Sequence, residues 1–78
     1  MDRRLLALDS KGVERILRRY GFLLDRSKGS HQQFVGFVRG KKRRVTVVTR
    51  QDRFTVKTLA SMIRQSGLSE QDWVDMCI

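Results

Sequence analysis

Residues 32–49 read QQFVGFVRGKKRRVTVVT, and this stretch decides the fold of the chain. Aromatic and β-branched residues dominate both of its ends, and such residues favour strands. The polar, glycine-containing segment 40–42 between them is typical of a hairpin connection. We therefore expect a strand over residues 32–38 and an antiparallel strand over residues 43–49.

A shorter strand is expected upstream of this hairpin. Residues 22–26 (FLLDR) have strand character, and residues 27–30 (SKGS) have the composition of a turn. Because both connections are short, the three strands should form an antiparallel meander.

One amphipathic helix is predicted on each side of the strands. Ser10 and Thr55 are the expected N-caps, and Gly21 and Gly67 the expected C-terminal ends. Each helix carries an apolar stripe at helical spacing. The stripe residues are Val13, Ile16, Leu17 and Tyr20 in the first helix, and Val56, Leu59, Ala60 and Ile63 in the second.

The two ends of the chain differ in pattern. Ser69 and Asp72 have the spacing of a capping box, which predicts a short terminal helix that carries Trp73. Residues 1–9 lack such signals and are expected to form a flexible N-terminus.

The predicted order is therefore α-β-β-β-α with a short C-terminal helix. Two amphipathic helices need one shared apolar surface, so we expect an α+β fold with both helices on one face of a three-stranded antiparallel sheet. The opposite face is then left to solvent or ligand. A length of 78 residues fits one domain over residues 1–78.

The charge of the chain points to a polyanionic or acidic partner. Lys and Arg total 17 against 8 Asp and Glu, which gives a net charge of +9. Residues 39–44 (RGKKRR) alone hold five cations in six positions. A merely solvated basic surface is the alternative, but clustering of the charge favours binding of nucleic acid or of an acidic protein.

Several classes of function are disfavoured by composition. Cys77 is the single cysteine, so no internal disulfide is possible, and a reducing cytoplasm fits. No stretch resembles a signal peptide or is long enough to span a bilayer. The carboxylates are scattered, which disfavours a catalytic metal site, and no phosphate loop or dinucleotide motif is present. We expect no metal and no cofactor.

His31 is the only histidine and follows Lys28-Gly29-Ser30. RNA cleavage requires little of a protein, because the substrate supplies its own 2′-hydroxyl nucleophile. An imidazole can act as the general base, while cations and backbone N–H groups hold the phosphate. Gly29 lets the backbone approach a phosphate closely, and its N–H could donate together with that of Ser30. An ordinary polar histidine at the start of a strand is the alternative interpretation.

A family resemblance is carried by four segments: Gly21-Phe22, Lys28-Gly29-Ser30-His31, Arg44-Val45-Thr46-Val47, and Thr58-Leu59 through Ile63-Arg64-Gln65-Ser66-Gly67-Leu68-Ser69. On these segments, which lie between residues 10 and about 70, the chain resembles the HicA toxins of bacterial toxin–antitoxin systems. The resemblance implies a fold like that of double-stranded-RNA-binding domains. It also implies ribosome-independent cleavage of mRNA with His31 as the catalytic residue, arrest of translation, and a HicB-like antitoxin as partner.

The segment after the third strand departs from the family pattern. Family members commonly have a proline and often a second histidine there, whereas residues 48–51 (VTRQ) have neither. A second imidazole is therefore not available as general acid. Proton delivery to the leaving oxygen would fall to water or to Lys28.

These observations lead to one expected function and two alternatives. We expect a cytoplasmic, metal-independent mRNA interferase. The alternatives are a non-catalytic RNA-binding domain of the same fold and a module whose basic face only docks an acidic protein. The run 39–44 fits either an RNA-binding surface or the surface that an antitoxin covers, and the sequence does not separate these. The expected catalytic residue is His31, and the expected substrate-binding residues are Lys28, Gly29, Ser30, Arg43, Arg44 and Arg50.

Overall fold

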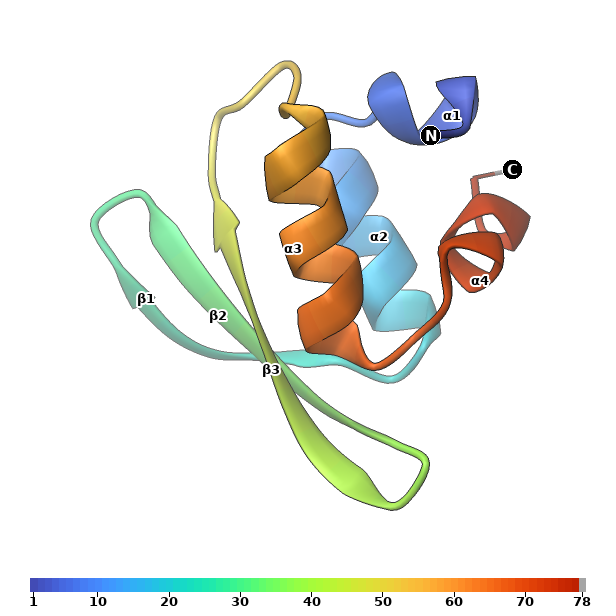
Figure 1. The fold of residues 1–78 in the computed structure, drawn as a ribbon. Coiled ribbons are helices and arrows are strands. Elements are labelled where there is room, and N and C mark those ends of the chain that lie inside the picture. Colours follow the sequence, from blue (N-terminus) through green and yellow to red (C-terminus); the bar gives the residue numbers. More distant parts are fainter. Residues whose placement is uncertain (78) are drawn as a thin grey trace.

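Three antiparallel strands in the spatial order β1-β2-β3 form the sheet of the computed structural model, which describes residues 1–77 (Figure 1). This arrangement confirms the predicted α+β fold and its similarity to double-stranded-RNA-binding domains. The elements are α1 (Arg3–Leu6), α2 (Ser10–Arg19), β1 (Leu23–Lys28), β2 (His31–Val38), β3 (Lys41–Val48), α3 (Val56–Ser66) and α4 (Glu70–Asp75).

Both strand connections are tight two-residue turns, so the strands run further than the sequence indicated. In the β1–β2 turn, Gly29 has φ 59° and Ser30 follows, which is typical of a type II′ turn. In the β2–β3 turn, Arg39 and Gly40 both have positive φ, 55° and 74°, as a type I′ turn requires. Such turns match the twist of the strands, which allows pairing up to the residues that flank each turn.

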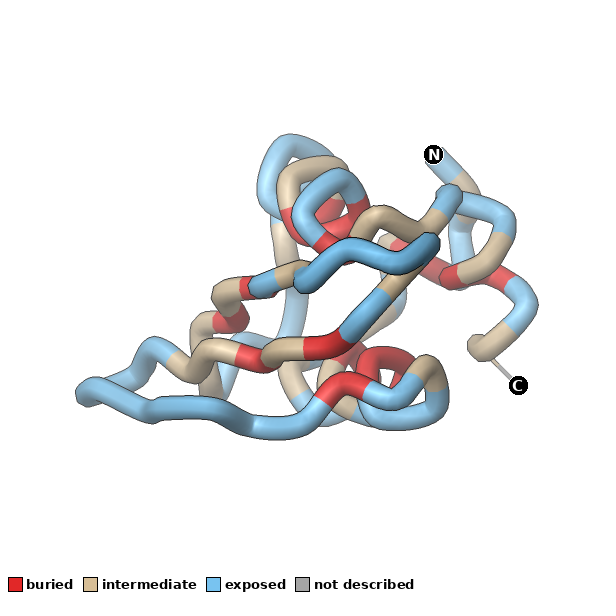
Figure 2. Tube along the Cα trace, turned by 90° about the horizontal axis from the view of Figure 1, so that it is seen from below, coloured by how far each residue is buried: buried red, intermediate tan, exposed pale blue. Residues whose placement is uncertain are grey.

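The apolar core lies between one face of the sheet and the helices. Phe34 of β2 and Val45 and Val47 of β3 are buried on that face, and both α2 and α3 pack against β3. β1 contributes no residue to the core and is exposed along its whole length (Figure 2). The buried residues are Leu5, Val13, Ile16, Leu17, Phe22, Phe34, Val45, Val47, Leu59, Met62, Ile63, Trp73 and Val74.

The N-terminus differs from the flexible segment that we expected. Residues Arg3–Leu6 form the helical turn α1, and the Asp2 side chain caps it by accepting a hydrogen bond from the Arg4 amide. Leu5 is fully buried and joins the core. The expectation is therefore wrong for this segment, because one buried leucine in a single turn leaves no periodic pattern to detect.

The helix boundaries are largely those expected. Thr55 caps α3, Gly67 ends it in the left-handed region, and Ser69 forms the predicted capping box with Asp72. The predicted N-cap of α2 is wrong by one residue, because Asp9 caps it.

Two residues of the predicted helices, Ser10 and Val56, do not have the roles that the sequence predicted. Ser10 instead links α2 to the end of β3, since its hydroxyl donates to the Val48 carbonyl at 2.7 Å. Val56 was expected in the core stripe but is 53% exposed, and Met62 takes part in the core instead. Within residues 1–77, no helix has the length and apolar character needed to cross a membrane.

Ser66 is the polar residue at the centre of the contact between α3 and α4. Its side chain is fully buried, and its hydroxyl donates to the Ile63 carbonyl at 2.6 Å. The same oxygen accepts hydrogen bonds from the Leu68 amide and from the Trp73 indole nitrogen, both at 3.1 Å. One hydroxyl therefore satisfies a buried and a partly buried donor and fixes the position of the terminal helix.

Replacing Ser66 by Ala should lower the free energy of unfolding by about 1–3 kcal/mol, because the buried indole N–H of Trp73 and the partly buried amide of Leu68 lose their acceptor. Urea titration followed by Trp73 fluorescence would measure the change. Ser61→Ala on the same helix is the matched control and should stay within about 0.5 kcal/mol. Equal effects of the two substitutions would contradict this role of Ser66.

Candidate active site

The face of the sheet that points away from the core carries the candidate site. Side chains alternate along a strand, and Phe34 and Gly36 of β2 are buried on the core side. His31 and Gln33 therefore project from the opposite, open face. The pairing of Gln33 with Thr46 adds a residue of β3 to the same face.

A β-bulge in β1 brings two cations to this face. Leu24 pairs with the buried Phe34, but Arg26 already pairs with Gln33, so Asp25 is the extra residue. In a regular strand, Leu24 and Arg26 would point to the same side. The bulge reverses the alternation, so Arg26 and the following Lys28 lie on the open face beside Gln33 and His31.

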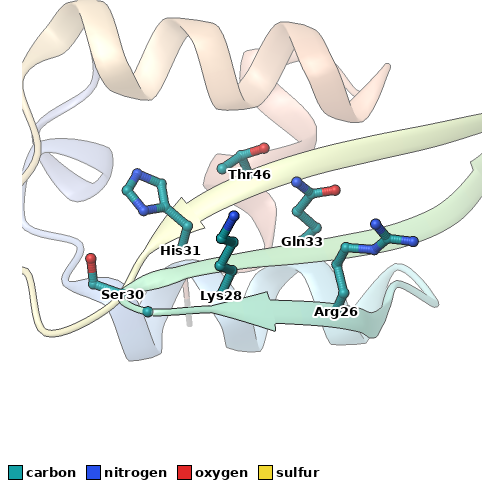
Figure 3. A pocket seen from close by; sticks show the side chains of 7 residues that line it. Arg26, Lys28, Ser30, His31, Gln33 and Thr46 are labelled. Atoms are coloured by element: carbon teal, nitrogen blue, oxygen red, sulfur yellow. The ribbon is translucent and has the colours of Figure 1, made fainter.

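Seven residues line a hollow of about 560 Å³ on the open face. The side chains of His31 and Lys28 stand next to each other, with Gln33 and Arg26 further along the strands (Figure 3). Among the described residues, those lining the hollow include two cations and one imidazole but no carboxylate. The lining residues are Arg26, Lys28, Gly29, Ser30, His31, Gln33 and Thr46.

His31 occupies the first position of β2, directly after the type II′ turn. It pairs with Lys28 on one side and with Val48 on the other, and its side chain is exposed. The turn is anchored to β3 because the Ser30 carbonyl accepts a hydrogen bond from the Thr49 amide at 2.7 Å. The imidazole is thus open to solvent while its backbone is held by pairing on both sides.

Arg44 of β3 borders the hollow and fixes the side chain of Gln33, which lines it. Its Nη1 atom donates to Gln33 Oε1 at 2.7 Å and to Asp25 Oδ2 at 2.9 Å. The hydrogen bond from Arg44 is the main reason that the pKa of Asp25 is lowered. Because the Gln33 oxygen is occupied by Arg44, its amide nitrogen is left to donate toward the hollow (Figure 3).

The sequence-predicted residues divide into three groups. Lys28, Gly29 and Ser30 line the hollow together with His31, as expected for one site. Arg44 lies at its border through Gln33.

The remaining two predicted residues, Arg43 and Arg50, are placed elsewhere. Arg43 pairs with Gly36, so its side chain lies on the core side of the sheet and is half-buried. It packs against Gly67, where an added Cβ would lie 2.6 Å from the Arg43 Nε atom. Arg50 lines a separate hollow with three carboxylates, those of Asp9, Glu14 and Asp52. The structure therefore places these two arginines outside the hollow that His31 lines, and their role as contacts to RNA stays a prediction.

Sequence reasoning did not assign Arg26, Gln33 and Thr46 to the site. Gln33 could have been found from strand alternation, since it lies two residues after His31. Thr46 follows once the register of β2 and β3 is known. Arg26 is close to His31 in the sequence, but its place in the hollow could not be predicted, because the bulge that turns it to the open face has no signature in residues 23–28.

Comparison with known proteins identifies the family. A search of curated proteins gave no match. The family model described as the HicA toxin of bacterial toxin–antitoxin systems matches residues 10–68, a range that contains α2, the whole sheet, α3 and every residue that lines the hollow. The chain therefore belongs to the HicA toxin family.

Proposed function

We propose that this HicA toxin is a metal-independent endoribonuclease that cleaves mRNA, with His31 as its general base. The observation that carries the proposal is an exposed imidazole beside Lys28, in a hollow on the open face of the sheet that Arg26 also lines. Family membership implies a cognate antitoxin, and we propose a HicB-like protein in this role. The substrate would be met in the cytoplasm.

The chemistry requires two proton transfers, one from the attacking 2′-hydroxyl and one to the leaving 5′-oxygen. His31 removes the proton from a ribose 2′-hydroxyl, and the oxygen attacks the adjacent phosphorus. The bond from phosphorus to the 5′-oxygen breaks, and that oxygen takes a proton from water or from the Lys28 ammonium. The products are a 2′,3′-cyclic phosphate and a free 5′-hydroxyl.

The cations and amides of the hollow suit the charge that develops on the phosphate. Arg26 and Lys28 lie on the same face as His31 and would stabilise the phosphorane. Backbone N–H groups at Gly29 and Ser30 and the Gln33 amide would hold the phosphate oxygens. In a site that has one imidazole, this positioning supplies a large part of the rate.

Replacing His31 by Ala should reduce cleavage of single-stranded RNA by at least about 10²-fold, the usual contribution of a positioned general base. Gel analysis of a labelled RNA would measure the rate, and the cyclic-phosphate end should appear only with the unaltered protein. Activity should persist in EDTA. A His31→Ala protein that cuts normally would contradict the proposal, and binding without cutting by the unaltered protein would favour the non-catalytic alternative.

Arg26→Ala should lower the cleavage rate by about tenfold to a hundredfold, because it removes a cation that stabilises the developing negative charge. Arg15→Ala is the matched control, since it removes the same charge from the exposed surface of α2. The control should keep the rate within about twofold, as expected when only net charge changes and screening is strong. Similar losses in both variants would show that net charge alone matters.

A further inference from the structure

Phe37 is the most exposed large apolar side chain of the described residues, with 72% of its surface accessible. It lies in the part of the β2–β3 hairpin that extends beyond β1, because the pairing of β1 with β2 ends at Val35. In Figure 1 this hairpin projects away from the helices. The ring therefore has no role in the core that would explain an aromatic residue there.

Cations surround this ring. Phe37 pairs directly with Lys42, and Val35, the preceding residue on the same face, pairs with Arg44. Residues 36–43 contain no acidic residue, and Arg44 is ion-paired with Asp25 of β1 through its Nη1 atom at 2.9 Å. The hairpin thus presents apolar side chains along β2 and a parallel row of cations along β3.

The turn at the end of the hairpin adds an unusual arginine. Arg39 has φ 55°, a region that non-glycine residues seldom adopt and that type I′ turns usually fill with Asn or Gly. An arginine at this position strains the backbone but places a guanidinium at the tip of the hairpin. Strain that persists at an exposed turn is typical of a residue kept for binding.

We propose that Phe37 is a stacking platform for a base of single-stranded RNA and that Arg39, Lys42 and Arg44 contact the flanking phosphates. This inference rests on the proposed function and extends it, because it defines where the RNA lies beyond the hollow. Aromatic rings beside a cationic groove are the usual means of holding single strands.

The strand gives the RNA a continuous path. His31 and Phe37 are six residues apart on the same face of β2, or about 20 Å at the rise of a strand. Val35 lies between them, so bases can follow the apolar side chains of β2 while phosphates follow the cations of β3. A protein partner is the less favoured occupant, since lysine such as Lys42 is depleted at the centres of protein interfaces, whereas cations beside an exposed aromatic ring are usual in single-strand binders.

Replacing Arg39 by Asn should separate folding from binding. Asn suits the left-handed region, so the melting temperature should rise by about 2–6 °C, as expected for relief of this strain in a domain of this size. RNA affinity should fall severalfold. Unchanged affinity would contradict a phosphate contact at the tip of the hairpin.

The test of Phe37 measures binding of 2′-O-methyl RNA, about 12 nucleotides long, which spans the site sizes typical of single-strand binders. This RNA has no free 2′-hydroxyl, so binding is read without cleavage. Phe37→Ala and Phe37→Leu should each weaken binding by about fivefold to a hundredfold, as loss of one stacked base does. Phe37→Trp should retain affinity, and its exposed indole should be quenched by RNA, unlike the buried Trp73.

Two further measurements separate stacking from charge and from catalysis. Phe37→Ala should leave the salt dependence of binding unchanged, whereas Lys42→Ala should reduce its slope by about one. On cleavable RNA, Phe37→Ala should raise KM severalfold and lower kcat by far less than the loss of at least about 10²-fold expected for His31→Ala.

Three outcomes would overturn the stacking proposal. Phe37→Leu could bind RNA as well as the unaltered protein, the Phe37→Trp fluorescence could fail to respond to RNA, or Phe37→Ala could weaken only the complex with the antitoxin. The last result would assign the ring to protein docking. An active His31→Ala protein would instead defeat the proposed function, and the binding results for Phe37 would still stand.

Discussion

Burial of one face of the sheet is the constraint on which the site depends. Phe34, Val45 and Val47 must face the helices, and this requirement fixes the register of β2 against β3. A slip of one residue would expose the core side chains and bury His31. The same packing excludes a side chain at Gly36, where an added Cβ would lie 2.8 Å from the ring of Phe22. The packing that stabilises the fold therefore also decides which side chains lie on the open face, where the proposed site is.

The position of β1 is not determined by core packing, because β1 contributes no residue to the core. Its position depends on hydrogen bonding to β2 and on the contact between Asp25 and Arg44. Freedom from packing is what permits a bulge at Asp25, and the bulge turns Arg26 and Lys28 toward His31. The cationic half of the hollow thus comes from the strand with the fewest packing constraints, and the histidine comes from the central strand with the most.

Much of this arrangement could be predicted from the sequence, wherever the cause is local. The strands, the N-cap at Thr55 and the capping box at Ser69 follow from residue types and spacing, and so does the proximity of Lys28 to His31. The predictions from sequence differ from the structure where contacts between residues far apart in the chain determine the conformation. Leu5 is held in place by the core residues that it contacts. The face of the sheet on which Arg43 lies depends on the pairing of β3 with β2. The bulge is set by pairing rather than by composition.

The separation between His31 and the basic hairpin has a consequence for catalysis. In the proposed mechanism, a site with one imidazole and no second histidine after β3 would gain little from proton transfer to the leaving oxygen. Binding energy from parts of the substrate that do not react can supply part of the deficit, because it positions the scissile phosphate. The proposed stacking at Phe37 would provide such energy about 20 Å from the reaction, at the rise of a strand. Both regions lie on the open face of β2, so a partner that covers this one face would block the proposed binding and the proposed chemistry together.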